Sequence, residues 1–181
     1  MLKWVLLIAA VPIALGLIVY AVGALLPADH RAAGEARVAA APERVAAIVR
    51  DLAAQPRWRK GVSRIEIVKR DAGGTHYVEH SSDGRIAFRF REEEPGARFR
   101  ATIDDPDLPF GGTWTIRLRP DGTGTQVAIE ERGTVRSPVY RFFSRFVFGQ
   151  DRTLRAYLRD LQAAAGSRQP LEASGASRSG P

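Results

Sequence analysis

The hydrophobic pattern changes twice along the chain, from a continuous apolar run to alternating positions and then to a helical stripe. Residues 4–26 hold no charged side chain and are nearly all apolar. A helix of this length reaches roughly 34 Å, enough to cross a bilayer core of about 30 Å. We therefore expect a transmembrane anchor at residues 1–26 and a linker at 27–32. A cleaved signal peptide is the alternative, because Lys3 supplies a positive start.

The charges that flank this run bear on its orientation. Lys3 precedes it, whereas Arg31, Arg37 and Arg44 follow it. Counting positive residues near the ends favours a single-pass membrane protein with a cytoplasmic domain. The short N-terminal tail suits the opposite insertion equally well, so the side of the membrane stays open.

Residues 33–165 are predicted to form one domain. Gly34 to Ala40 reads as a strand. Pro42 then opens a helix that continues to Leu52, because proline is favoured in a first helical turn. Residues 55–59 predict a second short helix or turn. Two short helices therefore follow the first strand.

From Val62 to Val135 the period becomes two, with apolar and polar residues alternating. Such alternation is typical of antiparallel strands with one buried face. Turn sequences at 71–74, 82–84 and 121–122 separate the alternating segments. The pattern predicts a meander, and with the first strand a curved antiparallel sheet of about six to seven strands.

A final helix follows the strands. Ser137 and Pro138 provide an N-cap and a first-turn proline, and an apolar stripe runs on to Leu161 before Gly166. One long helix packed across one sheet face gives an α+β fold. Residues 166–181 lack periodicity and large apolar side chains apart from Leu171, so we expect a disordered tail.

The composition of the chain excludes several kinds of catalytic and metal-binding site. The chain has 181 residues, a net charge of +7 and no cysteine, which excludes disulfides, thiolate metal sites and cysteine nucleophiles. It contains three histidines and lacks the usual nucleophile, phosphate-loop, dinucleotide and zinc motifs. We therefore expect no metal and no cofactor, and the sequence leaves open whether the protein is an enzyme.

Five short stretches resemble one protein superfamily. They are APERV at 41–45, PRW at 56–58, LPFGGTW at 108–114, ERGTV at 131–135 and SPVYR at 137–141. Together with the element order, they resemble the START and pollen-allergen superfamily (SRPBCC), whose members include polyketide cyclase/dehydrase and lipid-transport types. The resemblance implies a helix-grip fold and an apolar pocket. Members bind lipids, sterols, quinones or polyketides, and only some are enzymes.

A helix laid across a curved sheet leaves a cavity where facing side chains do not fill the gap, and a filled core is the alternative. Apolar residues on the expected inner faces are the candidate ligand contacts. They are Phe88, Phe90, Phe99, Trp114, Ile116, Ile129, Phe143 and Phe146.

Glu131 is the polar candidate among them, because it continues the inward parity of Val127 and Ile129. A buried carboxylate is costly unless paired or used, so Glu131 either orients a ligand or acts as an acid or base. The alternative is a position at the rim of the sheet. On another strand, Tyr77 and Glu79 share one face, and an inward Glu79 would offer a second carboxylate for acid–base catalysis.

Arginines recur through the predicted final helix, where a solvated face is the default interpretation. Next to a bilayer they would instead contact anionic headgroups. They are Arg141, Arg145, Arg152, Arg155 and Arg159. We expect no nucleic-acid binding, because no recognised motif is present.

The sequence thus favours a membrane-anchored domain that binds an apolar ligand, such as a lipid, isoprenoid, quinone or polyketide-like molecule. The bilayer, contacted through residues 4–26, and the small molecule are the expected partners. A cyclase or dehydratase-type enzyme with Glu131, Glu79 or Tyr77 as acid or base is one alternative. A non-catalytic interaction module with a filled core is the other.

Overall fold

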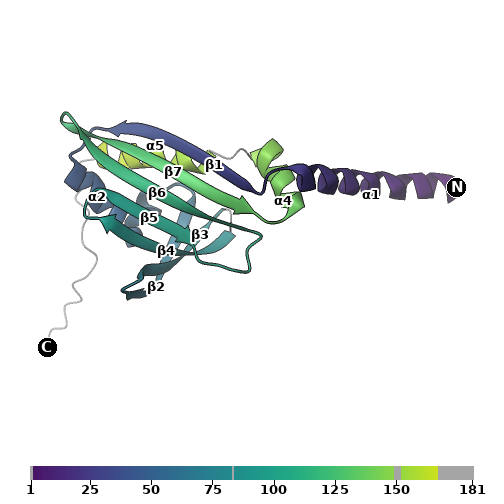
Figure 1. Ribbon diagram of the computed structural model, residues 1–181, viewed down its shortest axis with the longest axis horizontal. Helices are drawn as coiled ribbons and strands as arrows, with labels where there is room; N and C mark the ends of the chain where they lie inside the picture. Colours follow the sequence, from purple (N-terminus) through teal and green to yellow (C-terminus); the bar gives the residue numbers. More distant parts are fainter. Residues whose placement is uncertain (1, 83, 149–151, 167–181) are drawn as a thin grey trace.

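A computed structural model of the chain describes residues 2–82, 84–148 and 152–166 (Figure 1). The helices are α1 (Leu2–Leu25), α2 (Pro42–Arg50), η1 (Leu52–Ala54), α3 (Gln55–Trp58), α4 (Pro138–Phe143), η2 (Ser144–Phe148) and α5 (Arg152–Gly166). The strands are β1 (Asp29–Val38), β2 (Val62–Asp71), β3 (Gly74–Ser81), β4 (Gly84–Glu94), β5 (Arg98–Ile103), β6 (Phe110–Asp121) and β7 (Gly124–Val135).

The seven strands form one antiparallel sheet in the order β1-β7-β6-β5-β4-β3-β2. Strands β2 to β7 are a continuous meander, and β1 pairs with the last strand along its whole length. The α2–α3 region connects the two edge strands. The predicted α+β fold with an antiparallel sheet of about six to seven strands is therefore confirmed, and the sheet has seven.

Helix α5 lies across one face of the sheet, behind β1 and β7 in Figure 1. Its buried side chains include Leu154, Leu158 and Leu161, which recur on one face of the helix. Gly34 of β1 lets the helix approach closely, because a Cβ there would meet Leu154 and lie 3.2 Å from the Cδ1 atom of Leu158. The core thus joins α5 to the β1 side of the sheet.

The sequence predicted one long C-terminal helix, and this prediction is wrong in the extent of the helix. Helix α4 and the π-helical η2 come first, and α5 begins at Arg152. The two helices have different partners, because α4 packs against α1 and α5 packs against β1. In Figure 1, α4 lies beside α1 at one end of the sheet and is clearly separate from α5.

The two ends of the chain also bear on the predictions. Strand β1 begins at Asp29, within the segment 27–32 expected to be a linker, because its pairing with β7 starts at that residue. In the part of the chain that the structure describes, no helix is long and apolar enough to cross a membrane, so the predicted transmembrane helix is not supported. The predicted tail beyond Gly166 lies outside the described residues.

Replacing Gly34 tests how α5 is held on the sheet. Gly34→Val would displace the Leu154 and Leu158 side chains, and we expect unfolding to be easier by about 1–3 kcal/mol. Ala33→Val is the matched control, because Ala33 is exposed on the same strand. Urea denaturation of the full chain measures both. Equal stabilities of the two variants would contradict close packing at Gly34.

Candidate functional site

A cavity of about 470 Å³ opens between the sheet and α5. The inner faces of β3 to β6 line one side of it, and α3, η2 and α5 line the other. Its apolar side chains come mainly from the strands. On β3 to β6 they are Tyr77, Ile86, Phe88, Phe90, Ala101, Ile103, Phe110, Trp114 and Ile116.

The cavity exists because small residues occupy facing positions. Ala101 and Gly112 lie on the sheet side, and Ala156 lies on α5. On the other half of the sheet, Val127 and Ile129 of β7 are fully buried with the leucines of α5. The space between the sheet and α5 is therefore filled by side chains on the β1–β7 side and holds the cavity on the β3–β6 side.

A buried ion pair forms the polar part of the cavity. The Arg59 Nη1 donates to Glu79 Oε2 at 2.6 Å, and Nη2 donates to Glu79 Oε1 at 3.1 Å. Nη1 also donates to Gln55 Oε1 at 2.6 Å. The two charged side chains are only 14% and 11% exposed. This bidentate geometry fixes both side chains inside the cavity. Other polar residues also line it, namely Ser81, Ser82, Ser144, Arg152, Thr153 and Asp160.

Two tyrosines complete this polar cluster, which comprises Gln55, Arg59, Tyr77, Glu79 and Tyr157. The Arg59 guanidinium lies 5.3 Å from the ring centroid of Tyr157, a cation–π contact. Burial raises the pKa of Tyr157 to about 12. Burial and the neighbouring Glu79 also raise the pKa of Tyr77. Both phenols therefore stay protonated at neutral pH.

These groups give the cavity distinct chemical abilities. Its apolar lining favours burial of an apolar molecule, and the polar cluster offers donors and acceptors to one polar end of it. Glu79 and the tyrosine hydroxyls are also groups that can transfer protons.

The predicted ligand contacts fall into three groups. Phe88, Phe90, Trp114 and Ile116 line the cavity. Phe99 and Ile129 face the same side of the sheet but are buried in the core, with 0% and 1% exposure. Phe143 and Phe146 lie on the surface, with 39% and 60% exposure, because α4 and η2 do not continue α5.

Strand β3 presents its Tyr77 and Glu79 face to the cavity, which answers a question that the sequence left open. The neighbouring His76 lies 3.2 Å from Asp104, and His80 contacts Arg64 at 3.0 Å. These histidines bind polar groups outside the cavity lining.

Glu131 makes a separate contact from Glu79. Its Oε1 lies 3.5 Å from the His30 Nε2, and Trp114 hydrogen-bonds the carboxylate. The Glu131 side chain is 19% exposed. Removal from water raises the pKa of Glu131, although His30 and Trp114 oppose the change. Glu131 thus has His30 and Trp114 as partners, whereas Glu79 has Arg59.

Sequence reasoning missed Arg59, Gln55 and Tyr157 as site residues. Arg59 follows directly after the PRW segment at 56–58, and Tyr157 lies on the predicted apolar stripe. The sequence carried no specific signal for Arg59, because its partner Glu79 is 20 residues away on another element.

The five candidate headgroup arginines do not form one continuous stripe. Arg152 lies at the rim of the cavity on α5, and Arg155 and Arg159 are exposed on the same helix. Arg141 and Arg145 belong to α4 and η2. Binding of anionic headgroups stays a prediction.

Glu131 makes stability depend on pH. A folded-state pKa raised above 4.5 means that the contribution of Glu131 to stability is largest at low pH and is lost as Glu131 ionises in the folded protein. Glu131→Gln removes this loss, so we expect the variant to melt at a higher temperature than the wild type at pH 7. The difference should disappear below about pH 4.5. Thermal melts across this range measure it.

Glu130→Gln is the control, because Glu130 is next in sequence and its pKa is lowered by hydrogen bonding to Arg132. It should show the opposite trend. A Glu131→Gln variant that is less stable than the wild type at pH 7 would contradict the argument.

Comparison with known proteins identifies the relatives of this fold. The family model described as polyketide cyclase/dehydrase and lipid transport matches residues 29–166. No significant match to a curated protein was found.

Solved structures share the architecture. A START superfamily protein from Mycobacterium smegmatis matches at TM-score 0.61 and 17% identity, over 75% of this chain and 97% of that one. The Zhui aromatase/cyclase from Streptomyces sp. R1128 matches at TM-score 0.64 and 14% identity, over 76% and 93% of the two chains. Norcoclaurine synthase from Thalictrum flavum matches at TM-score 0.60 and 15% identity, over 75% of this chain and 86% of that one.

At these identities the structures share the fold alone. The family model, by contrast, covers the whole sheet and α5, from the first residue of β1 to the last residue of α5. The chain therefore belongs to the polyketide cyclase/dehydrase and lipid transport family.

Proposed function

We propose that the chain binds an apolar small molecule, of lipid, isoprenoid, quinone or polyketide-like character, in the cavity between the sheet and α5. The observation that carries this proposal is an apolar cavity of about 470 Å³ that contains one fixed polar cluster. The family description, which names both cyclases and lipid transport, supports the same class of ligand.

The energetics follow from the lining. Burial of apolar ligand surface contributes about 25 cal/mol per Å². A polar group at one end of the ligand would receive a hydrogen bond from a neutral tyrosine hydroxyl of the polar cluster. Arg59 and Glu79 are already paired, so a neutral polar group suits this end better than a charged one.

Filling the cavity tests this proposal. Ala156→Phe places a ring in the cavity from α5, and Ala163→Phe places the same ring on the exposed face of that helix. We expect Ala156→Phe to weaken binding of the apolar fluorescent probe N-phenyl-1-naphthylamine at least about tenfold, because a ring displaces ligand volume. Ala163→Phe should bind like the wild type.

Native mass spectrometry of the full chain, purified without detergent, provides the second measurement. A bound small molecule should accompany the wild type and be lost from Ala156→Phe. A folded wild type that carries no ligand and does not bind the probe would favour a module with a closed interior.

A cyclase-type activity is a second candidate, favoured by the position of Glu79 beside Tyr77 inside the cavity. In such an enzyme Glu79 would take or give a proton while the ligand loses one water molecule. The wild type incubated with its co-purified ligand, or with a synthetic poly-β-ketone, should then yield a product lighter by one water. Glu79→Gln should stop this change, whereas Glu66→Gln, on the exposed side of β2, should not. An unchanged ligand mass in the wild type would contradict it.

A further inference from the structure

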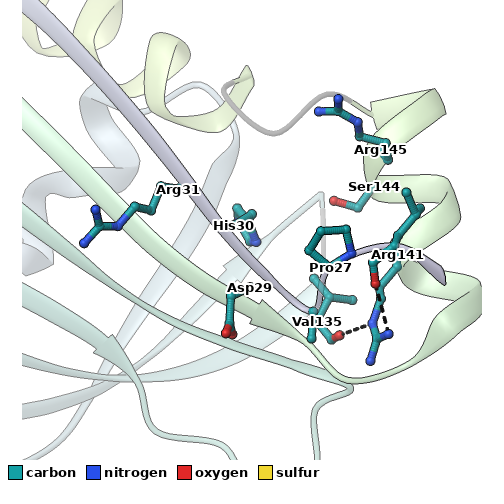
Figure 2. A pocket seen from close by; sticks show the side chains of 10 residues that line it. Pro27, Asp29, His30, Arg31, Val135, Arg141, Ser144 and Arg145 are labelled. Carbon is teal, nitrogen blue, oxygen red and sulfur yellow. Dashed lines mark hydrogen bonds between the residues drawn. The ribbon is translucent and has the colours of Figure 1, made fainter. Parts of the chain in front are cut away.

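A second cavity, of about 280 Å³, lies at the end of the sheet where α4 and η2 meet β1. It is separate from the apolar cavity in its lining, with Ser144 as the residue that they share. Figure 2 shows it between the start of β1 and the helical segment that carries Arg141, Ser144 and Arg145. We call it the polar cavity.

Arg141 is held in place at the polar cavity by backbone carbonyls. Its Nε donates to the Val135 carbonyl at 2.7 Å, and Nη2 donates to the Arg136 carbonyl at 3.1 Å. Its Nη1 donates to the Leu26 carbonyl at 3.3 Å. Figure 2 shows the bond to Val135. The guanidinium is therefore ordered before any ligand arrives, which reduces the entropy lost on binding.

Carbonyl oxygens orient the Arg141 guanidinium without neutralising it. Three of its five N–H groups are used in these bonds, which leaves two for another acceptor. In the described part of the chain, no carboxylate forms an ion pair with Arg141. A half-buried positive charge without a counter-charge favours binding of an anion.

The remaining charges of the polar cavity add to this preference. Arg145 lines it and is exposed, and the Ser144 hydroxyl supplies a neutral donor. Figure 2 shows Ser144 and Arg145 on the side opposite the Arg141 guanidinium, whereas Arg31 projects away. Among the lining residues Asp29 is the one acid, and its Oδ1 already accepts a hydrogen bond from Thr134 at 2.7 Å.

We propose that the polar cavity is an anion site that binds a phosphate group through Arg141, Arg145 and Ser144. Donors on two sides of the cavity suit a tetrahedral oxyanion, and the guanidinium fork matches a pair of phosphate oxygens. The phosphate is either free or part of an amphiphile. In the second case the shared residue Ser144 lies where an attached chain would pass into the apolar cavity.

Isothermal titration calorimetry on the full chain tests the site with two probes, inorganic phosphate and the short-chain lipid dihexanoyl phosphatidic acid. We expect at least one of them to bind the wild type. Arg145→Gln should weaken that binding about tenfold, since it removes one charged donor. Arg119→Gln is the matched control, because it removes the same charge from an exposed position on β6 that does not line the polar cavity, and it should change binding less than about twofold.

The probes separate the two sources of phosphate. Equal affinity for both indicates a site for free phosphate, and much tighter binding of the lipid indicates an amphiphile that spans both cavities. Ala156→Phe should then weaken binding of the lipid but not binding of inorganic phosphate. A failure of the proposed apolar ligand site is thereby distinguishable from a failure of the anion site. Either pattern of affinities supports the anion site, provided that Arg145→Gln weakens binding.

Two results would overturn the proposal. One is that neither probe binds the wild type, and the other is that Arg145→Gln and Arg119→Gln weaken binding equally. Arg141→Gln provides a further test if circular dichroism shows that it folds, because a folded variant with wild-type affinity would remove Arg141 from the site. If it does not fold, Arg145→Gln decides the question.

Discussion

The close contact between α5 and β1 is the constraint on which the cavity depends. At Gly34 the helix approaches the strand closely enough for Leu154 and Leu158 to lie against the backbone. This contact fixes α5 over the β1–β7 side of the sheet. Ala156 and Tyr157 of the same helix are thereby placed along the cavity that β3 to β6 line. A helix centred over the sheet would bury both halves equally and leave no space for a ligand.

The Arg59–Glu79 pair has a different significance from the apolar packing around it. Desolvation of two charges largely offsets their attraction, so apolar residues of similar volume would stabilise the fold at least as well. The pair is only slightly exposed and lies in the lining of a cavity. This position fits the proposed function, in which the pair would help to recognise the ligand. Tyr157, under the guanidinium, connects the same pair to α5.

The sequence pattern predicts the sheet well because a period of two depends only on which face of a strand is buried. That is why the inward positions of Phe88, Phe90, Trp114 and Ile116 followed from alternation. Alternation does not say where along the sheet the helix lies. Phe99 and Ile129 have the same parity, yet they fill the core instead of lining the cavity.

The prediction for the first part of the final helix was wrong for a related reason. Phe143 and Phe146 continue the helical stripe in sequence, but α4 packs against α1 and leaves both rings on the surface. The choice between two partners for one apolar stripe depends on tertiary contacts, which periodicity does not contain. Arg59 was missed because its partner, Glu79, is on another element and the pairing is visible only in three dimensions.

The pairing of β1 with β7 has a consequence for how the chain acquires its structure. The side chains of Asp29 and Thr134 that meet across this pair are 105 residues apart in the sequence. During synthesis β1 therefore has no partner strand until β7, the last strand of the meander, has left the ribosome. Contacts of such long range slow folding and prolong the exposure of apolar segments. The β1–β7 pair therefore closes the longest sequence separation in the sheet, whereas the other six strands pair with their neighbours in sequence.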